Sequence, residues 1–276
     1  ALADALAECY ADPLRHVLIS YPWRAVDTAL EGYDGPDRWQ RDFLNELGAE
    51  VKKRGFDGIN AVDPIQFSTA SGHGIGKSCM TAWIVRWIID TRPGARGVVT
   101  ANTNEQIRGK TWAELAKWNH MSITKHWWTL NAGGAGSMNM YRKSEPETWR
   151  VDAQTSREEN SEAFAGLHNA TSTAFFVFDE CAGIADKLFE VREGGLTDGE
   201  PMTFDWGNPT RNSGRFHQNM VGKFRHRYIT RHIDSRDVSI TNKTYLKRMI
   251  DDHGIDSDVV KVRVLGQFPS SAEHQF

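Results

Sequence analysis

Residues 71–78 carry the clearest chemical signature in the sequence, Ser-Gly-His-Gly-Ile-Gly-Lys-Ser. The apolar stretch Ile65–Ala70 precedes them and predicts a short buried strand, and apolar residues at helical spacing follow. Glycines between a strand and a helix let backbone amides turn toward an anion, and the helix N-terminus adds partial positive charge. The segment therefore predicts a phosphate-binding loop, in which Lys77 reaches the β- and γ-phosphates and the Ser78 hydroxyl ligates Mg²⁺.

This loop departs from the pattern G-x-x-x-x-G-K-[S/T] at its first position, where Ser71 stands. The alternative is an ordinary glycine-rich turn, which the flanking strand and helix disfavour. Trp83 and Trp87 recur at helical spacing in the following helix and are expected to be core contacts. The residues expected to bind nucleotide in this segment are Ser71, Gly72, His73, Gly74, Ile75, Gly76, Lys77, Ser78 and Cys79.

A second signal is the apolar run Ala174–Phe178, which ends in Asp179-Glu180. Asp179 is expected to hold Mg²⁺ through water, and Glu180 to polarise the water that attacks the γ-phosphate. Acidic residues also follow many strands that have no catalytic role, so the interpretation depends on the accompanying phosphate loop. A base beside the metal favours an ATPase over a small-molecule kinase.

The third polar strand end is Gly207-Asn208-Pro209-Thr210, which follows the apolar run Met202–Trp206. Asn208 or Thr210 is expected to sense the γ-phosphate and to change its hydrogen-bond partner when that phosphate leaves. The alternative is a simple Gly-Asn-Pro turn.

The elements that must position these groups alternate between strands and helices. Asp37 and Gln40 cap an expected helix at about 37–53, and Thr103 with Gln106 opens another that extends to about Asn119. The other expected strands are Gly97–Ala101, Thr148–Gln154 and Arg227–Thr230. This alternation predicts an α/β fold with a mainly parallel sheet flanked by helices. Together with the phosphate loop and the acidic strand end, the expected fold class is a P-loop NTPase of the RecA-like, ASCE type. In such sheets the residues after Ala70, Phe178 and Trp206 converge.

The composition fits a globular protein, since 39% of the 276 residues are hydrophobic, 25% are charged and the net charge is −3. These values exclude a highly charged disordered chain and a collagen-like repeat. The apolar runs are much shorter than the ~20 residues of a membrane span, so no membrane partner is expected. Three cysteines without metal-like spacing favour neither a disulfide framework nor a zinc site, and a reducing intracellular setting is expected.

Charge is distributed unevenly along the chain. Residues 1–50 hold four basic and ten acidic groups, whereas residues 223–248 hold eight basic and two acidic groups. The basic segment is a candidate for sequence-independent contacts to DNA phosphates. The alternative is a solvated charged face.

With these motifs in order, the sequence resembles the ATPase domain of the large terminase subunit of tailed bacteriophages, the motor that packages DNA into proheads. Upstream of the phosphate loop, Trp39-Gln40 resembles the adenine-recognition segment of that family, in which the glutamine amide reads the base edge. The resemblance covers most of residues 35–269 and rests on Ser71–Ser78, Thr100–Gln106, Phe175–Glu180 and Gly207–Thr210.

This resemblance implies an enzyme that binds ATP and Mg²⁺ and couples ATP hydrolysis to translocation of double-stranded DNA. The implied partners are the portal protein, the small terminase subunit and further copies of the chain in a ring, expected to be a pentamer. The implied location is the host cytoplasm, transiently on the prohead and not in the mature virion. Two alternatives stay open: a helicase-like or other P-loop ATPase outside packaging, and a nucleotide-gated assembly module with little turnover.

His73 stands where many terminases place an arginine in the phosphate loop. The resemblance implies that a neighbouring subunit supplies the cation, with Arg157 as the first candidate and Arg150 as the second. For both arginines the alternative is a solvated surface side chain.

The expected organisation has three parts: an N-terminal helical segment with the adenine-recognition region at 1–60, the P-loop ATPase core at 61–266, and the start of a linker at 267–276. Val264–Pro269 resembles the exit from the ATPase domain of terminases, which leads to a nuclease domain. Because this sequence stops at Phe276, no nuclease activity is expected from it.

Overall fold

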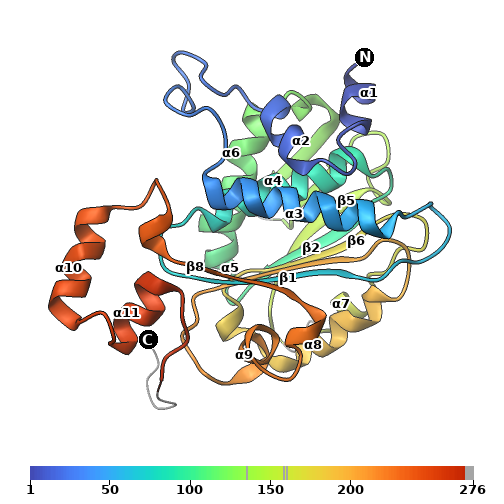
Figure 1. The fold of residues 1–276 in the computed structure, drawn as a ribbon. Coiled ribbons are helices and arrows are strands. Elements are labelled where there is room, and N and C mark those ends of the chain that lie inside the picture. The colour runs from blue at the N-terminus through green and yellow to red at the C-terminus, as the bar shows by residue number, and fades with distance from the viewer. Residues whose placement is uncertain (135, 158, 160, 271–276) are drawn as a thin grey trace.

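The computed structural model of the protein describes residues 1–270 except 135, 158 and 160 (Figure 1). An eight-stranded sheet with the order β3-β4-β5-β2-β6-β7-β1-β8 forms its centre. The strands from β5 to β8 in this order pair in parallel, while β3 and β4 add antiparallel pairs at one edge. The strands are β1 (Ile65–Ser71), β2 (Arg96–Ala101), β3 (Trp128–Ala132), β4 (Met138–Arg142), β5 (Arg150–Thr155), β6 (Ala174–Phe178), β7 (Met202–Gly207) and β8 (Ile229–Ile233).

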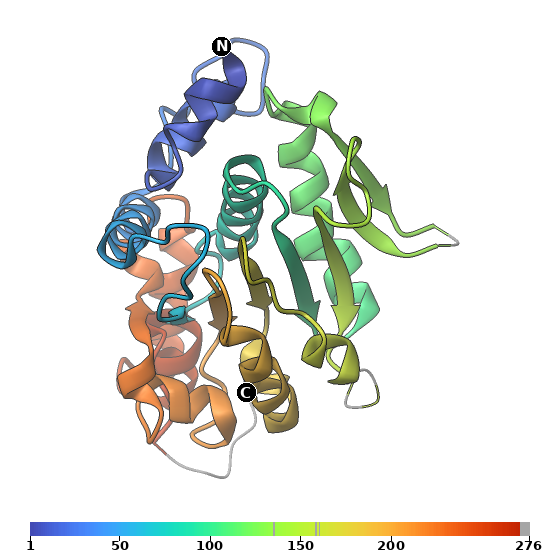
Figure 2. The same ribbon diagram turned by 90° about the vertical axis from the view of Figure 1, so that its right-hand side faces the viewer.

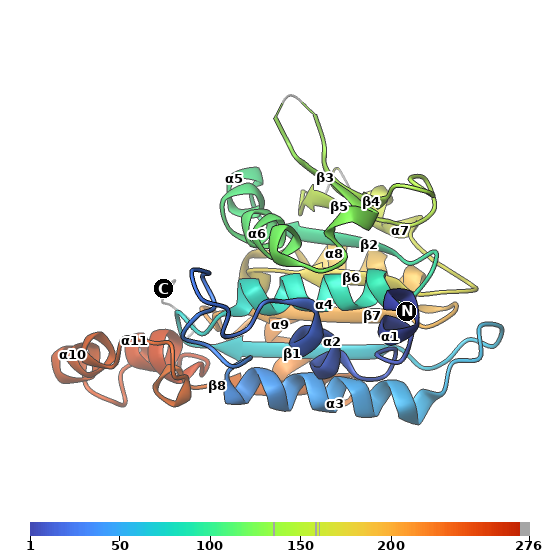
Figure 3. The same cartoon turned by 90° about the horizontal axis from the view of Figure 1, so that it is seen from above.

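Helices cover both faces of this sheet, so the predicted α/β fold with a mainly parallel sheet is confirmed (Figures 1 and 3). One face carries α1 (Leu2–Ala7), α2 (Pro13–Ser20), α3 (Arg38–Arg54), α4 (Lys77–Thr91) and α6 (Ala113–Met121). The other face carries α7 (Ser161–Ala165), α8 (Asp186–Arg192) and α9 (Gly214–Met220). Beyond the sheet, near β8, lie α10 (Lys243–His253) and α11 (Asp258–Val260). None of the described helices has the length and apolar character of a bilayer span.

Strand β6 shows why the sheet needs helices on both sides, because all five of its residues are buried. Successive side chains of a strand point to opposite faces. Phe175 and Val177 accordingly pack into the core beneath α3 and α4, whereas Phe176 and Phe178 pack with the side chains of α8 and α9. A strand with this pattern cannot lie at a solvated surface of the sheet.

The helix predicted from Thr103 to about Asn119 is confirmed, and it contains a segment that the pattern did not indicate. Thr103 and Gln106 form the expected capping box, with reciprocal hydrogen bonds of 3.1 and 3.0 Å between side chain and backbone. The chain then passes through α5 (Asn104–Gln106), the π-helix η1 (Ile107–Trp112) and α6. A π-helix widens the turn and changes which side chains share a face.

Two strand boundaries differ from the sequence-based expectation. The last strand is Ile229–Ile233 rather than Arg227–Thr230, because residues Arg225–Arg227 form a 3₁₀ turn. The strand expected at Thr148–Gln154 begins two residues later, at Arg150, because Trp149 donates its backbone N–H to the carbonyl of Glu145 in a preceding turn. Both shifts lie at strand ends and leave the sheet order unchanged.

The antiparallel hairpin of β3 and β4 was not predicted. Its strands are short and half-buried, and the alternation of apolar and polar residues is too weak in such strands to predict them. Figure 2 shows the hairpin, in green, extending away from the body of the protein. The glycine-rich segment 133–136 connects the two strands, and its residue 135 lies outside the described residues.

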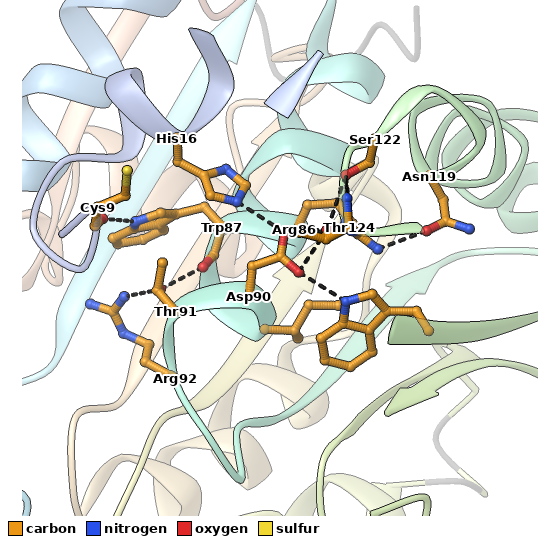
Figure 4. A network of polar contacts seen from close by, with 12 residues as sticks. Cys9, His16, Arg86, Trp87, Asp90, Thr91, Arg92, Asn119, Ser122 and Thr124 are labelled. Atoms are coloured by element: carbon orange, nitrogen blue, oxygen red, sulfur yellow. Dashed lines mark hydrogen bonds and ion pairs between the residues drawn. The ribbon is translucent and has the colours of Figure 1, made fainter. Parts of the chain in front are cut away.

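A buried polar cluster joins α2, α4 and the segment that follows α6 (Figure 4). His16 Nε2 lies 3.0 Å from Asp90 Oδ2, and the indole N–H of Trp128 donates to Asp90 Oδ1 over 2.8 Å. Arg86, one helical turn before Asp90, donates to Asn119 over 2.7 Å. Burial opposes ionisation of Asp90, but the charge of Arg86 and the bond from His16 outweigh it and hold the pKa of Asp90 below its usual range. The cluster therefore fixes α2 onto the core through a buried charge.

We predict that Arg86→Met destabilises the fold strongly. Arg86 and Asp90 are fully buried, and removing the arginine leaves a carboxylate without its charge partner. The free energy of unfolding in urea should fall by about 3–5 kcal/mol. Arg15→Met is the matched control, because Arg15 forms a half-exposed ion pair with Glu8 whose loss should cost at most ~1 kcal/mol. Equal losses for the two variants would contradict the role of the cluster.

Candidate active site

The loops after β1, β6 and β7 open into one cavity of about 1210 Å³. Because β7 lies between β6 and β1 in the parallel sheet, their carboxyl ends meet at the same edge. Residues His73–Cys79, Asp179, Glu180, Gly207 and Asn208 all line this cavity. The predicted convergence of the three strand ends is therefore confirmed.

The phosphate loop runs from β1 into α4, as the sequence predicted. Gly74 and Gly76 have φ angles of 74° and 88°, in the left-handed region that favours glycine. The amides of Gly72 and His73 donate to the carbonyls of Ile233 and Arg263, at 3.1 and 2.8 Å. Anion binding therefore falls to the later amides, which include the first turn of α4 and its partial positive charge.

Gly72 lies where no side chain fits. A Cβ at this position would meet the Ser235 hydroxyl at 2.2 Å and the Val264 carbonyl at 2.4 Å. The Ser235 hydroxyl also donates to the carbonyl of His73 over 2.8 Å. The loop is thus packed directly against the 3₁₀ turn η7 (Ser235–Asp237) and the π-helix η8 (Lys261–Leu265), two elements from the C-terminal part of the chain.

Lys77 points back across the loop, and its ammonium donates to Ser71 Oγ over 3.0 Å. Burial lowers the pKa of Lys77, and the nearby carboxylates of Asp179 and Glu180 oppose that shift. An ammonium that has lost part of its hydration gains from an anionic ligand in the cavity.

Asp179 is buried at the end of β6, and burial raises its pKa. Its carboxylate accepts hydrogen bonds from the Thr111 hydroxyl at 2.9 Å and from the Glu180 amide at 2.9 Å. Glu180 adopts φ 54° and ψ 46°, a left-handed conformation that is uncommon outside glycine. Such strained residues concentrate at functional sites, where the surrounding structure holds them. The ammonium of Lys110 lies 2.7 Å from Glu180 Oε1.

Asn208 connects the third strand end to the phosphate loop. Its side-chain amide donates to the carbonyl of Ser71 over 2.7 Å. Thr210, the alternative candidate, donates its backbone N–H to the Asn208 carbonyl and is not among the residues that line the cavity. Of the two, Asn208 is the residue that lines the cavity and contacts the loop.

Trp39 and Gln40 lie beneath the phosphate loop at the start of α3. The indole N–H of Trp39 donates to the Ile75 carbonyl over 3.1 Å. The amide of Gln40 lines the cavity, accepts the Asp37 N–H at 2.8 Å and donates to the Gly76 carbonyl at 3.3 Å. Both side chains support the loop, and Gln40 alone of the pair lines the cavity where a base would bind.

Arg157 and Arg150 lie near opposite ends of β5. Arg157 is exposed and follows the carboxyl end of the strand, on the side of the sheet where the cavity opens. Arg150 is the first residue of β5, and its guanidinium forms two hydrogen bonds with the Asp152 carboxylate, at 2.7 and 2.9 Å. The assignment of Arg157 as a residue that acts on a neighbouring subunit stays a prediction.

His73 is the histidine of the phosphate loop. Loss of hydration and the positive charges of Lys77 and Arg263 lower the pKa of His73 below its usual range. Its imidazole is therefore neutral near pH 7 and adds no positive charge to the loop.

Sequence reasoning missed Lys110 and Thr111, which contact the two carboxylates after β6. The capping box at Thr103 predicted a helix here but not the π-helix, so the face that these residues occupy could not be read from helical spacing. The available signal was that Lys110 stands in the helix directly after β2, the strand next to β6 in the sheet.

Four of the eight basic residues in segment 223–248 form ion pairs with carboxylates among the described residues. Arg227 lies 3.0 Å from Glu193 Oε1, and Arg231 contacts Glu46. The described ion pairs also include Arg236 with Asp234 and Lys247 with Asp251. These pairs reduce the positive charge that the segment offers to DNA.

Comparison with known proteins gives relatives in sequence and in fold. The chain is 25% identical over 280 residues to a probable terminase large subunit of Enterobacteria phage P7, an alignment that covers 96% of this chain and 52% of that protein. The chain thus spans about half the length of this curated relative. No protein-family model matches it.

Three solved structures share the fold. The large terminase of bacteriophage HK97 superposes with a TM-score of 0.66 at 9% identity, over 94% of this chain and 55% of that one. The large terminase of a thermophilic bacteriophage, in complex with ADP, gives 0.58 at 16% identity, over 75% and 48% of the two chains. The ATPase domain of the Thermus phage P74-26 large terminase gives 0.52 at 14% identity, over 74% and 88%. In sequence the chain is thus related to a phage large terminase subunit, and its fold is the α/β P-loop NTPase fold of terminase ATPase domains, which confirms the resemblance drawn from its motifs.

Proposed function

We propose that the chain is the ATP-hydrolysing motor domain of a viral terminase large subunit, which drives double-stranded DNA into a prohead. The observation that carries this proposal is the single cavity in which a phosphate loop, an acidic pair and a polar sensor meet. P-loop proteins have many functions, and the similarity to a terminase large subunit favours DNA packaging among them. The ADP complex of the large terminase from a thermophilic bacteriophage supports nucleotide as the ligand.

In this proposal Lys77 and the loop amides bind the β- and γ-phosphates of ATP, and Glu180 takes a proton from the attacking water. Asn208 senses the γ-phosphate through the carbonyl of Ser71, which it holds at 2.7 Å. A change at that bond passes into the segment between β7 and α9.

Ser78 and Asp179 would hold Mg²⁺, and their chemistry fits this ion. A carboxylate and a hydroxyl are the oxygen ligands that Mg²⁺ prefers, and both line the cavity. Among the described residues no group of three His, Cys, Asp or Glu side chains is placed to bind a metal alone. Mg²⁺ commonly takes its remaining ligands from water and substrate phosphates. When bound, the ion neutralises negative charge on the phosphate oxygens.

Further expectations from the resemblance complete the proposal. In the adenine-recognition region Gln40 lines the cavity, and Trp39 supports the phosphate loop beneath it. Arg157 serves the site of a neighbouring subunit in a homo-oligomeric ring, expected to be a pentamer. The portal protein, the small terminase subunit and double-stranded DNA are the partners, and the host cytoplasm is the location. Residues 61–266 form the ATPase core.

Lys77→Ala and Glu180→Gln test the catalytic assignment. Lys77→Ala should abolish both nucleotide binding and hydrolysis, since it removes the ammonium that faces the phosphates. Glu180→Gln should keep nucleotide binding and lower kcat by about 100-fold or more, because the amide cannot accept the proton. Steady-state phosphate release and titration with a fluorescent ATP analogue measure the two effects.

Glu114→Gln is the matched control for Glu180→Gln, since Glu114 lines the same cavity from α6. Its turnover should stay near that of the wild type. Substantial hydrolysis by both Lys77→Ala and Glu180→Gln would exclude this cavity as the ATPase site.

His73→Ala should lower kcat by less than about tenfold, since a neutral imidazole supplies under ~1.4 kcal/mol of charge stabilisation. Because the pKa of His73 is lowered, His73 becomes protonated only at acidic pH. The pH profiles of kcat for the variant and the wild type should therefore coincide between about pH 6.5 and 8, at and above the usual histidine pKa. A larger loss, or a profile that differs in this window, would make His73 a catalytic residue.

Mixing of inactive subunits tests Arg157. Arg157→Ala subunits retain an intact site, and Glu180→Gln subunits retain Arg157. Mixed rings should therefore recover ATPase activity that neither variant shows alone. Mixtures of Arg157→Ala with a double variant that lacks both residues supply the control, and absence of recovery in the first mixture would remove the trans assignment.

A further inference from the structure

We propose that Lys110 is a catalytic residue of the same chain, whose ammonium contacts the γ-phosphate of bound ATP beside Lys77. This proposal rests on the proposed ATPase function and adds a residue to it. Lys110 lines the cavity together with Lys77 and the two carboxylates of the β6 end. No other lysine or arginine among the described residues forms an ion pair with Asp179 or Glu180.

The π-helix η1 carries Lys110 to the acidic pair at the end of β6. Two consecutive residues of this helix reach two consecutive carboxylates, with Lys110 Nζ 2.7 Å from Glu180 Oε1 and Thr111 Oγ1 2.9 Å from Asp179 Oδ2. In an α-helix successive side chains point about 100° apart, and the wider π turn reduces this angle. Single π turns occur often at functional sites. The helix thus presents two consecutive side chains to the acidic pair.

The ion pair with Glu180 leaves Lys110 available for a ligand. The side chain of Lys110 is 60% exposed and that of Glu180 is 30% exposed, so their attraction is screened by water. Lysine carries its charge on a flexible four-carbon stem, which can move between neighbouring anions. The hydrogen bond to Glu180 raises the pKa of Lys110, so the side chain is protonated at neutral pH.

The charge balance of the loop calls for a second cation. ATP brings several negative charges, and charge redistributes over the phosphate oxygens as the bond to the leaving group breaks. Within the loop, His73 is neutral near pH 7 and Lys77 is the remaining cationic side chain. Lys110 lines the same cavity as both residues, and its ammonium lies 2.7 Å from Glu180 Oε1.

Lys110→Met and Lys110→Arg provide the test, because methionine keeps most of the stem and arginine keeps the charge. Lys110→Met should lower kcat by about 100-fold, the typical effect of removing one donor to a transition state. It should also weaken binding of ATPγS at least fivefold relative to binding of ADP, since only the former offers a γ-phosphate. Lys110→Arg should recover most of both losses.

Lys117→Met is the matched control. Lys117 lies on α6, lines the same cavity, is 52% exposed and pairs with Glu114 at 3.7 Å. This variant should keep wild-type turnover and wild-type discrimination between ATPγS and ADP. Far-ultraviolet circular dichroism on all variants confirms that each is folded.

The proposal is overturned if Lys110→Met keeps kcat within threefold of the wild type. It is also overturned if kcat falls while the ratio of ATPγS to ADP affinity stays unchanged, since Lys110 would then act only by positioning Glu180. In either case Lys77→Ala and Glu180→Gln would still abolish turnover if the ATPase assignment is correct. Retained turnover in those two variants would instead remove the proposed function itself.

Discussion

Parallel pairing of β1, β6 and β7 is the constraint on which the candidate site depends. The pairing fixes neighbouring strands ~4.8 Å apart, so groups that follow each strand inherit their spacing from backbone hydrogen bonds. Lys77, Asp179 and Asn208 are distant in the sequence but meet at one edge of the sheet. The helices on both faces keep this edge in place by burying every side chain of β6.

Burial also sets the electrostatic character of the site. It lowers the pKa of Lys77 and raises that of Asp179, because each charged group has lost hydration. A ligand of opposite charge would compensate for that loss. In the proposed function, a triphosphate and a divalent cation would supply a partner of opposite sign to each residue. Their binding would then offset the loss of hydration that burial imposes on both charges.

The sequence predicted those features that short local patterns encode. The phosphate loop, the acidic end of β6 and the capped helices at Asp37 and Thr103 follow from residue type and spacing over a few positions. The hairpin β3–β4 was missed because its strands are short and only half-buried. The contacts of Lys110 and Thr111 depend on a π-helix, for which propensity gives no signal.

The supporting role of Trp39 was likewise beyond local patterns, because its hydrogen bond joins residues 36 positions apart. The ion pairs of Arg227 with Glu193 and of Arg231 with Glu46 could not be predicted for the same reason, since these partners come together only in the folded chain.

The attachment of α2 to α4 has a consequence for how short a fragment of this protein can be. A fragment that starts at α3 would lose His16, which faces the buried Asp90, and the Cys9 carbonyl, which accepts the indole N–H of Trp87 over 2.8 Å. The segment from α1 to α2 thus stabilises α4, the helix that follows the phosphate loop. Removing this segment would destabilise α4, although the segment's contacts with α4 lie outside the cavity.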